Sequence, residues 1–288
     1  MDHLSSFSPL AHRYQGFILD LWGVIHDGVT AFPHAAVCLE RLRDARRRTL
    51  LVSNAPRPNT AIQALMRSMG LPDSLYSAIL TSGEAVRSAL RSPPDAWWAT
   101  LGPRVFLLGP DRDRPILDGL PLDSVQSPGQ ADFVLNTGPD DRCNPTDINA
   151  FEDILQACLA HRLPMVCANP DLAVIRGGVR VLCAGALALR YHELGGDVRS
   201  LGKPDPAIYD QALELLDVSP DLVLVVGDSL RTDIAGAMGV GLPSCWVLSG
   251  IHGANLARPD GSFDTERAEA EARSAGVAPI ATIPRFAW

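Results

Sequence analysis

The stretch Phe17-Ile18-Leu19-Asp20-Leu21-Trp22-Gly23-Val24 decides the fold of this chain. Three apolar residues lead directly into a carboxylate, and a glycine follows three positions later. An uninterrupted apolar run is typical of a parallel strand that is covered on both faces. Asp20 then lies where the strand ends, and ligands bind at that edge of open α/β sheets. The stretch therefore predicts an α/β protein whose functional site is organised around Asp20.

Length, composition and charge narrow the class of protein. The 288 residues favour two domains, at roughly 100–200 residues each. A net charge of −8 argues against nucleic acid or an anionic membrane as the main partner. No apolar run approaches the ~18–20 residues that span a bilayer, and the N-terminus lacks the pattern of a signal peptide. We therefore expect a cytoplasmic protein whose cysteines, which form no Cys-x-x-Cys pair, are free thiols.

Further apolar runs predict the remaining strands. The core strands are expected at 49–52, 78–81, 222–226 and 244–248, and the tail after residue 254 should add a charged helix and an edge strand. Between them, the composition changes near Arg91, and strands at 105–108, 133–135 and 165–168 with a helix at 146–161 indicate an inserted α/β domain. We assign residues 1–82 and 184–288 to the core domain and 83–183 to the insertion.

Three predicted strands end in chemically useful groups, which are Asp20, Ser53-Asn54 and Asp228. The carboxyl ends of parallel strands share one edge of the sheet, so these groups can meet at one ligand. Mg²⁺ prefers oxygen ligands and takes one or two protein carboxylates. A carboxylate can also attack phosphorus as a nucleophile, while Ser53 and Lys203 can hold phosphate oxygens. This inventory favours phosphoryl transfer.

Four motifs in this order resemble motifs I to IV of the haloacid dehalogenase (HAD) superfamily: Asp20-x-Trp22-Gly23-Val24, Ser53-Asn54, Gly202-Lys203-Pro204 and Gly227-Asp228-Ser229-x-x-x-Asp233. A closer match is to its class IIA branch of sugar-phosphatase-like and nitrophenylphosphatase-like proteins, and this match is carried by Asn169-Pro170-Asp171, Ala184-Gly185-Ala186-Leu187 and Thr232-Asp233-Ile234-Ala235-Gly236-Ala237. The resemblance extends from about Gly16 to His252. It implies a Rossmann-like core with a parallel sheet and an inserted α/β cap of the C2 type.

The resemblance also implies a role for each matching residue, with Mg²⁺ as cofactor and a small phosphorylated metabolite as substrate. Asp20 would be the nucleophile and a metal ligand, and Lys203 would bridge it to the phosphate. The remaining roles are metal ligation by the Trp22 carbonyl and Asp228, support of that shell by Asp233, phosphate binding by Ser53 and the Asn54 amide, and substrate contacts by Asn169 and Asp171. A homodimer is left open.

One departure from the family pattern concerns Trp22. Phosphatases of the superfamily carry a second aspartate there, which acts as general acid and base, a role worth roughly 10²–10⁴-fold in rate. Three interpretations remain open: another acid such as His26 or Asp27 replaces it, the substrates have good leaving groups, or the protein binds phosphorylated ligands without turnover. Carbon–phosphorus cleavage would need a cap lysine, and residues 83–183 contain none.

We therefore predict a phosphoric monoester hydrolase that acts on a sugar phosphate or aryl phosphate through an aspartyl-phosphate on Asp20. The alternative is a catalytically weak or inactive protein of the same fold that binds phosphorylated ligands.

Overall fold

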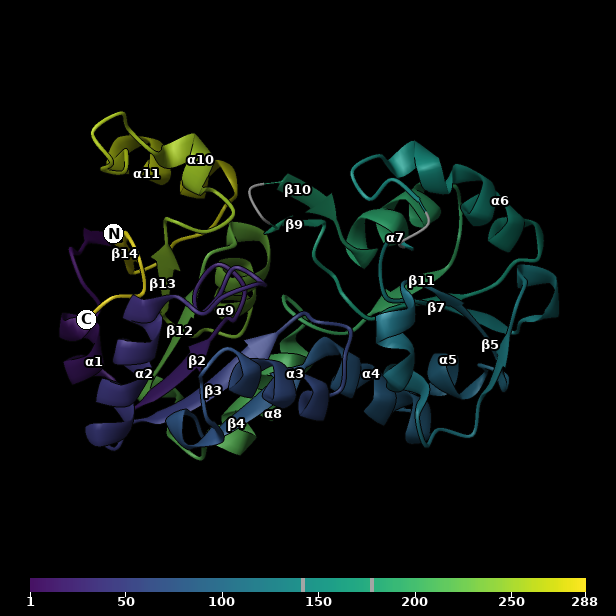
Figure 1. Ribbon diagram of the computed structural model, residues 1–288, viewed down its shortest axis with the longest axis horizontal. Coiled ribbons are helices and arrows are strands. Elements are labelled where there is room, and N and C mark those ends of the chain that lie inside the picture. Colours follow the sequence, from purple (N-terminus) through teal and green to yellow (C-terminus); the bar gives the residue numbers. More distant parts are fainter. Residues whose placement is uncertain (141–142, 177–178) are drawn as a thin grey trace.

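The computed structural model describes residues 1–140, 143–176 and 179–288. Figure 1 shows two lobes, a core that contains both chain termini and a cap built from the middle of the chain. None of the described helices is long and apolar enough to cross a membrane.

The core lobe is built on a seven-stranded sheet in which every neighbouring pair of strands is parallel. Its strands, in spatial order, are β1 (Asp2–His3), β14 (Ala281–Ile283), β13 (Ser244–Val247), β12 (Val223–Gly227), β2 (Gly16–Leu19), β3 (Arg48–Ser53) and β4 (Ala78–Thr81). The sequence predicted that the strand in the tail, which is β14, lies at the edge of the sheet. That prediction was wrong, because β1 pairs with β14 and forms the edge.

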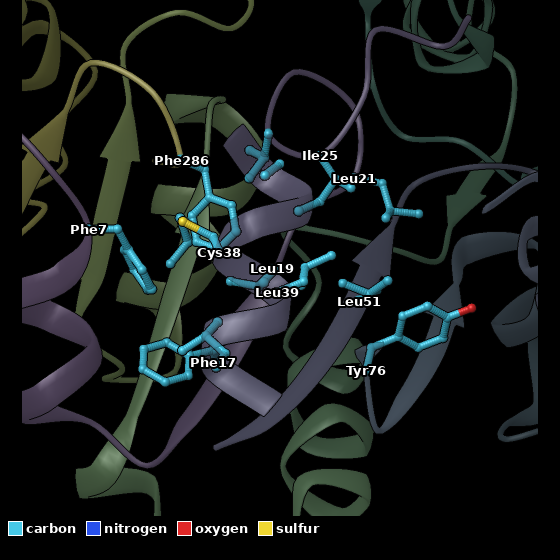
Figure 2. Packing of buried hydrophobic residues seen from close by; sticks show 14 of the residues in the cluster. Phe7, Phe17, Leu19, Leu21, Ile25, Cys38, Leu39, Leu51, Tyr76 and Phe286 are labelled. Atoms are coloured by element: carbon cyan, nitrogen blue, oxygen red, sulfur yellow. The ribbon is translucent and has the colours of Figure 1, made fainter. Parts of the chain in front are cut away.

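Side chains of β2 alternate between two apolar cores, one on each face of the sheet, as the two-residue period of a strand requires. Phe17 and Leu19 face the core that contains Phe7 and Phe286, and Ile18 faces the other. Figure 2 shows the first of these cores, in which the rings of Phe7 and Phe17 meet edge to face with centroids 5.4 Å apart. Burial on both faces explains why the strand shows no polar alternation.

Helices surround the core sheet, and short polar signals begin several of them. Their bounds are α1 (Ser8–Arg13), α2 (Pro33–Asp44), α3 (Asn59–Ser68), α8 (Pro206–Leu216), α9 (Ala235–Gly239), α10 (Gly253–Leu256) and α11 (Thr265–Ser274). The carboxylate of Asp205 accepts a hydrogen bond from the Ala207 amide and so caps α8, with Pro206 in its first turn. This start fixes the end of the loop that carries Lys203.

The cap lobe contains a second parallel sheet with its own apolar core. Its strands, in spatial order, are β11 (Val198–Ser200), β8 (Met165–Cys167), β7 (Phe133–Asn136), β5 (Arg104–Leu108) and β6 (Asp123–Val125). The helices of this lobe are α4 (Ser82–Arg91), α5 (Ala96–Ala99), α6 (Glu152–Ala160) and α7 (Ala184–Glu193), and an antiparallel hairpin is formed by β9 (Ala173–Arg176) and β10 (Val179–Leu182). The predicted α/β core with an inserted α/β cap is thus confirmed.

The cap sheet continues past residue 183, where the sequence placed the end of the insertion. β11 pairs with β8, and Leu187 and Tyr191 of α7 belong to the apolar core of the cap. The short strand Val198-Arg199-Ser200 is too polar to be recognised from its pattern. We therefore propose that the cap ends near Leu201 rather than at 183.

Candidate active site

Three neighbouring strands of the core sheet deliver the predicted acidic and phosphate-binding groups. β12, β2 and β3 lie side by side, and they end next to Asp228, Asp20 and Ser53 respectively. The backbone amide of Asp20 donates a hydrogen bond of 2.9 Å to the oxygen of Val226, so the parallel pairing continues to the edge of the sheet. Residues separated by more than 200 positions in the sequence therefore meet at one point.

Asp20, Asp228 and Asp233 form a compact carboxylate cluster. Each residue offers one carboxylate oxygen, and these atoms all lie within 4.8 Å of one another. Gly23 and Gly250 permit this packing, because a Cβ on either would lie within 2.1 Å and 1.9 Å of Asp228 Oδ2. Oxygen donors gathered at this spacing suit Mg²⁺, which prefers carboxylate ligands and water.

Lys203 lies at the base of this cluster and is the only lysine in the chain. Its Nζ donates hydrogen bonds to Asp20 Oδ1 at 2.6 Å, Asp233 Oδ1 at 2.7 Å and the carbonyl oxygen of Val52 at 3.0 Å. Only 2% of the residue is exposed. Burial opposes its charge, but the carboxylates of Asp20 and Asp233 prevail and raise the pKa of Lys203. The ammonium therefore stays charged and fixes the orientation of Asp20.

The cluster carries more negative charge than one ammonium can balance. Burial, with a contribution from Asp233, raises the pKa of Asp20 to about 7, although Lys203 acts in the opposite direction. Burial, and then the charges of Asp20 and Asp233, raise the pKa of Asp228 as well. A divalent cation among these oxygens would remove the excess charge, so the residues present fit Mg²⁺.

Ser53 and Asn54 lie at the wall of the same cavity, as predicted. The Asn54 side chain has a role that sequence reasoning missed. Its Nδ2 donates to Asp171 Oδ1 at 2.9 Å and to the Lys203 carbonyl oxygen at 3.0 Å, and its Oδ1 accepts from the Lys203 amide at 2.8 Å. Asn54 thereby positions the lysine loop and links it to the cap.

The two nearest candidates for the missing acid do not line the cavity. His26 is buried, its Nδ1 accepts a hydrogen bond from the Gly28 amide, and burial lowers its pKa to about 4. Asp27 is half-buried, and its carboxylate accepts hydrogen bonds from the amides of Val29 and Thr30. Both residues shape a turn, so the structure gives no support to either as the acid.

Trp22 and the Asn169-Pro170-Asp171 segment do line the cavity. The indole Nε1 of Trp22 donates a hydrogen bond of 3.0 Å to the carbonyl oxygen of Ile175 in the cap hairpin. Asn169 Oδ1 accepts from the Asp171 amide at 3.0 Å, which orders the segment. Burial raises the pKa of the Asp171 carboxyl against the opposing effect of Lys203.

Sequence reasoning missed five further groups that line the cavity, one from the core and four from the cap: Arg57, and Arg112, Asp113, Thr137 and Arg176. Two of these follow the carboxyl ends of parallel cap strands at short distance, Arg112 after β5 and Thr137 directly after β7. The rule that identified Asp20 in the core sheet therefore applies to the cap sheet as well. The carboxyl ends of both sheets face the same cavity.

Two protein-family models match parts of this chain. A haloacid dehalogenase-like hydrolase model matches residues 17–122, and a HAD-hydrolase-like model matches residues 200–277. Chronophin from Bos taurus is 31% identical over 255 residues, which cover 83% of this chain and 82% of the relative.

Solved structures show the same fold. A hydrolase of the haloacid dehalogenase-like family from Brucella suis aligns with a TM-score of 0.83 and 32% identity over 98% of this chain and 99% of that one. A glycerol phosphate phosphatase from Mycobacterium tuberculosis, crystallised with magnesium, aligns with a TM-score of 0.63 and 24% identity, over 86% of this chain and 71% of the other.

Proposed function

The chain belongs to the haloacid dehalogenase-like hydrolases, and on that premise we propose that it hydrolyses a small phosphomonoester through an aspartyl-phosphate on Asp20, with Mg²⁺ as cofactor. The observation that carries this proposal is the pair of hydrogen bonds by which Lys203 Nζ holds Asp20 and Asp233 inside the carboxylate cluster. Two relatives are named acid sugar phosphatase and D-glycerol 3-phosphate phosphatase, which supports the reaction class.

The first step is transfer of the phosphoryl group to the enzyme. A carboxylate oxygen of Asp20 attacks phosphorus, the bond from phosphorus to the substrate oxygen breaks, and the departing alkoxide takes up a proton. Water then attacks phosphorus and gives a proton to the group that donated one in the first step, the bond from phosphorus to Asp20 breaks, and inorganic phosphate leaves. Lys203 favours the ionised form of Asp20 and orients it, and Ser53 with the Asn54 amide holds the phosphate oxygens. Mg²⁺, held by Asp20, Asp228 and the Trp22 carbonyl with Asp233 in support, would neutralise phosphate charge.

The proton for the leaving group needs a donor other than Trp22. We assign this role to Asp171, because its carboxyl lines the cavity with Asp20 and its pKa is raised by burial. A carboxyl group with a raised pKa keeps its proton closer to neutral pH and can donate it, as general acid catalysis requires. The side-chain amide of Asn54 donates a hydrogen bond to one oxygen of this carboxyl and holds it in place.

A second candidate function is binding of phosphorylated ligands with little turnover. It is favoured by the presence of an indole where the family's phosphatases carry an acid, and by the engagement of that indole with the cap. Steady-state assays on p-nitrophenyl phosphate and glycerol 3-phosphate, with Mg²⁺ or with a chelator, separate the two functions. An enzyme turns over at least the aryl phosphate and stops when the metal is removed.

The nucleophile is tested by Asp20→Asn, which should lower kcat by at least about 10³-fold, on the scale seen when a catalytic nucleophile is removed. Asp27→Asn is the matched control, because the amide oxygen can still accept the hydrogen bonds of the turn. It should retain activity. Equal rates for Asp20→Asn and the unmodified protein would contradict the proposal.

A further inference from the structure

Two sets of charged side chains line the cavity. Asp20 and Asp171 belong to the site described above, close to Lys203. The lining also includes three guanidinium groups, those of Arg57 from the core and of Arg112 and Arg176 from the cap, together with the carboxylate of Asp113. The reaction proposed above gives none of these four groups a role.

The three arginines are close enough to influence one another. Burial lowers the pKa of Arg57, Asp113 opposes this effect, and the charges of Arg112 and Arg176 add to the lowering. The ion pair between Arg57 and Asp113 is loose, because Arg57 Nε lies 3.6 Å from Asp113 Oδ1, beyond ordinary hydrogen-bond length. Arg57 Nε thus makes no direct hydrogen bond to this carboxylate.

Two polar atoms that line the cavity are buried without a hydrogen-bond partner among the described residues. They are Arg57 Nε and the hydroxyl oxygen of Thr137, and only 3% of Thr137 is exposed. The hydroxyl lies against Gly109, where a Cβ would come within 1.9 Å of it. A buried donor without a hydrogen-bond partner destabilises the protein. Both residues line the cavity, so a bound molecule with oxygen acceptors can satisfy them.

We propose that this cavity selects phosphomonoesters that carry a second anionic group, a carboxylate or another phosphate, which the three arginines bind. The inference rests on the proposed function, which places the scissile phosphate at Asp20. Guanidinium groups bind carboxylate and phosphate oxygens in pairs of parallel hydrogen bonds. The cavity volume of about 120 Å³ is well below the ~300–1,000 Å³ of sites for drug-sized ligands, so the carbon chain between the two groups is short.

A matched substrate pair tests the second anionic group. D-3-phosphoglycerate and glycerol 3-phosphate have three carbons each and differ chiefly in a carboxylate against a hydroxymethyl group. The carboxylate should raise kcat/KM by about tenfold or more, on the scale of one charge-assisted hydrogen bond. A second pair, 1,3-propanediol bisphosphate and 3-hydroxypropyl phosphate, tests a phosphate in the same position. Equal kcat/KM values within both pairs would overturn the proposal.

Substitution of the arginines tests where the preference arises. In Arg57→Gln, Arg112→Gln and Arg176→Gln the ratio of the two kcat/KM values should fall toward one. Arg91→Gln is the control, because Arg91 is exposed and does not line the cavity. It should keep the ratio of the unmodified protein. A ratio that survives all three cavity substitutions would also overturn the proposal.

Binding to Asp20→Asn separates this inference from the proposed reaction. Titration calorimetry with Mg²⁺ present compares the dissociation constants of D-3-phosphoglycerate and glycerol 3-phosphate without turnover. Tighter binding of the carboxylate compound by about tenfold supports the anionic subsite even if no hydrolysis is found, in which case only the proposed function fails. Hydrolysis without any preference in binding or rate would refute the anionic subsite but not the proposed function. Failure of both compounds to bind would also refute the subsite.

Discussion

The indole nitrogen of Trp22 donates a hydrogen bond to the carbonyl oxygen of Ile175. This bond joins the loop that follows the nucleophile strand to the β9–β10 hairpin of the cap. Two further hydrogen bonds join core and cap. Asn54 donates one to Asp171, and Arg231 donates the other to the carbonyl oxygen of Pro170. The residue that departs from the family pattern thus connects the two lobes beside the cavity.

Loss of the Trp22 hydrogen bond should weaken closure of the cap. Trp22→Phe keeps an aromatic ring near Gly28 but removes the donor, so kcat/KM should fall by about 2–10-fold, the worth of a typical net hydrogen bond. Trp97→Phe is the matched control, because it removes an indole hydrogen bond to Asp197 in the cap, away from the cavity lining. Equal effects of the two substitutions on kcat/KM would show that the contact between Trp22 and Ile175 has no special role.

Replacement of Asp171 should reveal the proton donor through the leaving group. Asp171→Asn should lower kcat for glycerol 3-phosphate by about 10²-fold or more, while p-nitrophenyl phosphate, whose leaving group needs little protonation, should lose much less. A purely structural role would lower both rates in the same proportion. Steady-state rates for the two substrates across pH 5 to 9, with the unmodified protein beside the variant, distinguish these outcomes.

Removal of the single lysine should destabilise the folded state. Lys203→Met leaves Asp20 and Asp233 buried without their ammonium partner, and breaking a buried ion pair costs about 3–5 kcal/mol. Mg²⁺ should restore part of this loss, because it binds the carboxylates only in the folded state. Urea unfolding with and without Mg²⁺ measures both effects. A loss below about 1 kcal/mol in the metal-free protein would contradict the charge balance described above.

His26 should make the protein sensitive to acid without taking part in catalysis. Its pKa is lowered from 6.5 to about 4 by burial, so between these values the unfolded chain holds a proton that the folded chain lacks. The free energy of unfolding should therefore fall as pH drops through this window, by about 3 kcal/mol in all.

The variant His26→Asn tests this directly, because its amide oxygen can accept the hydrogen bond of the Gly28 amide but does not titrate. Urea unfolding between pH 4 and 7 should show a shallower dependence on pH in the variant, while kcat at pH 7 stays unchanged. A large fall in kcat would instead return His26 to the list of acid candidates.

The acidic groups of the site could be predicted because they follow apolar strands. Asp20 and Asp228 each end a buried run, and the parallel sheet brings them together whatever their separation in the sequence. The position of Lys203 near these groups could be predicted as well, because the lysine precedes a helix that leads into the strand before Asp228. These predictions depend on local patterns, which a single sequence carries.

The contacts between core and cap could not be predicted in the same way, because they depend on how the two domains meet. Nothing near Trp22 in the sequence indicates a bond to Ile175, and Arg57 comes close to Asp113 only when the cap is in place. The end of the cap that we propose near Leu201 differs from the predicted end at 183, because the strand Val198–Ser200 that pairs with β8 is short and polar. The pairing of β1 with β14 joins the two ends of the chain, and no local pattern announces it.

The central claim is that Asp20 carries the phosphoryl group during turnover. Rapid acid quench of the enzyme reacting with p-nitrophenyl phosphate and Mg²⁺, followed by peptide mass spectrometry, tests it most directly. The account predicts a phosphorylated peptide whose modified residue is Asp20, absent from Asp20→Asn and from samples that contain a chelator. Steady turnover with no modified Asp20, or with the phosphoryl group on a different residue, would contradict it.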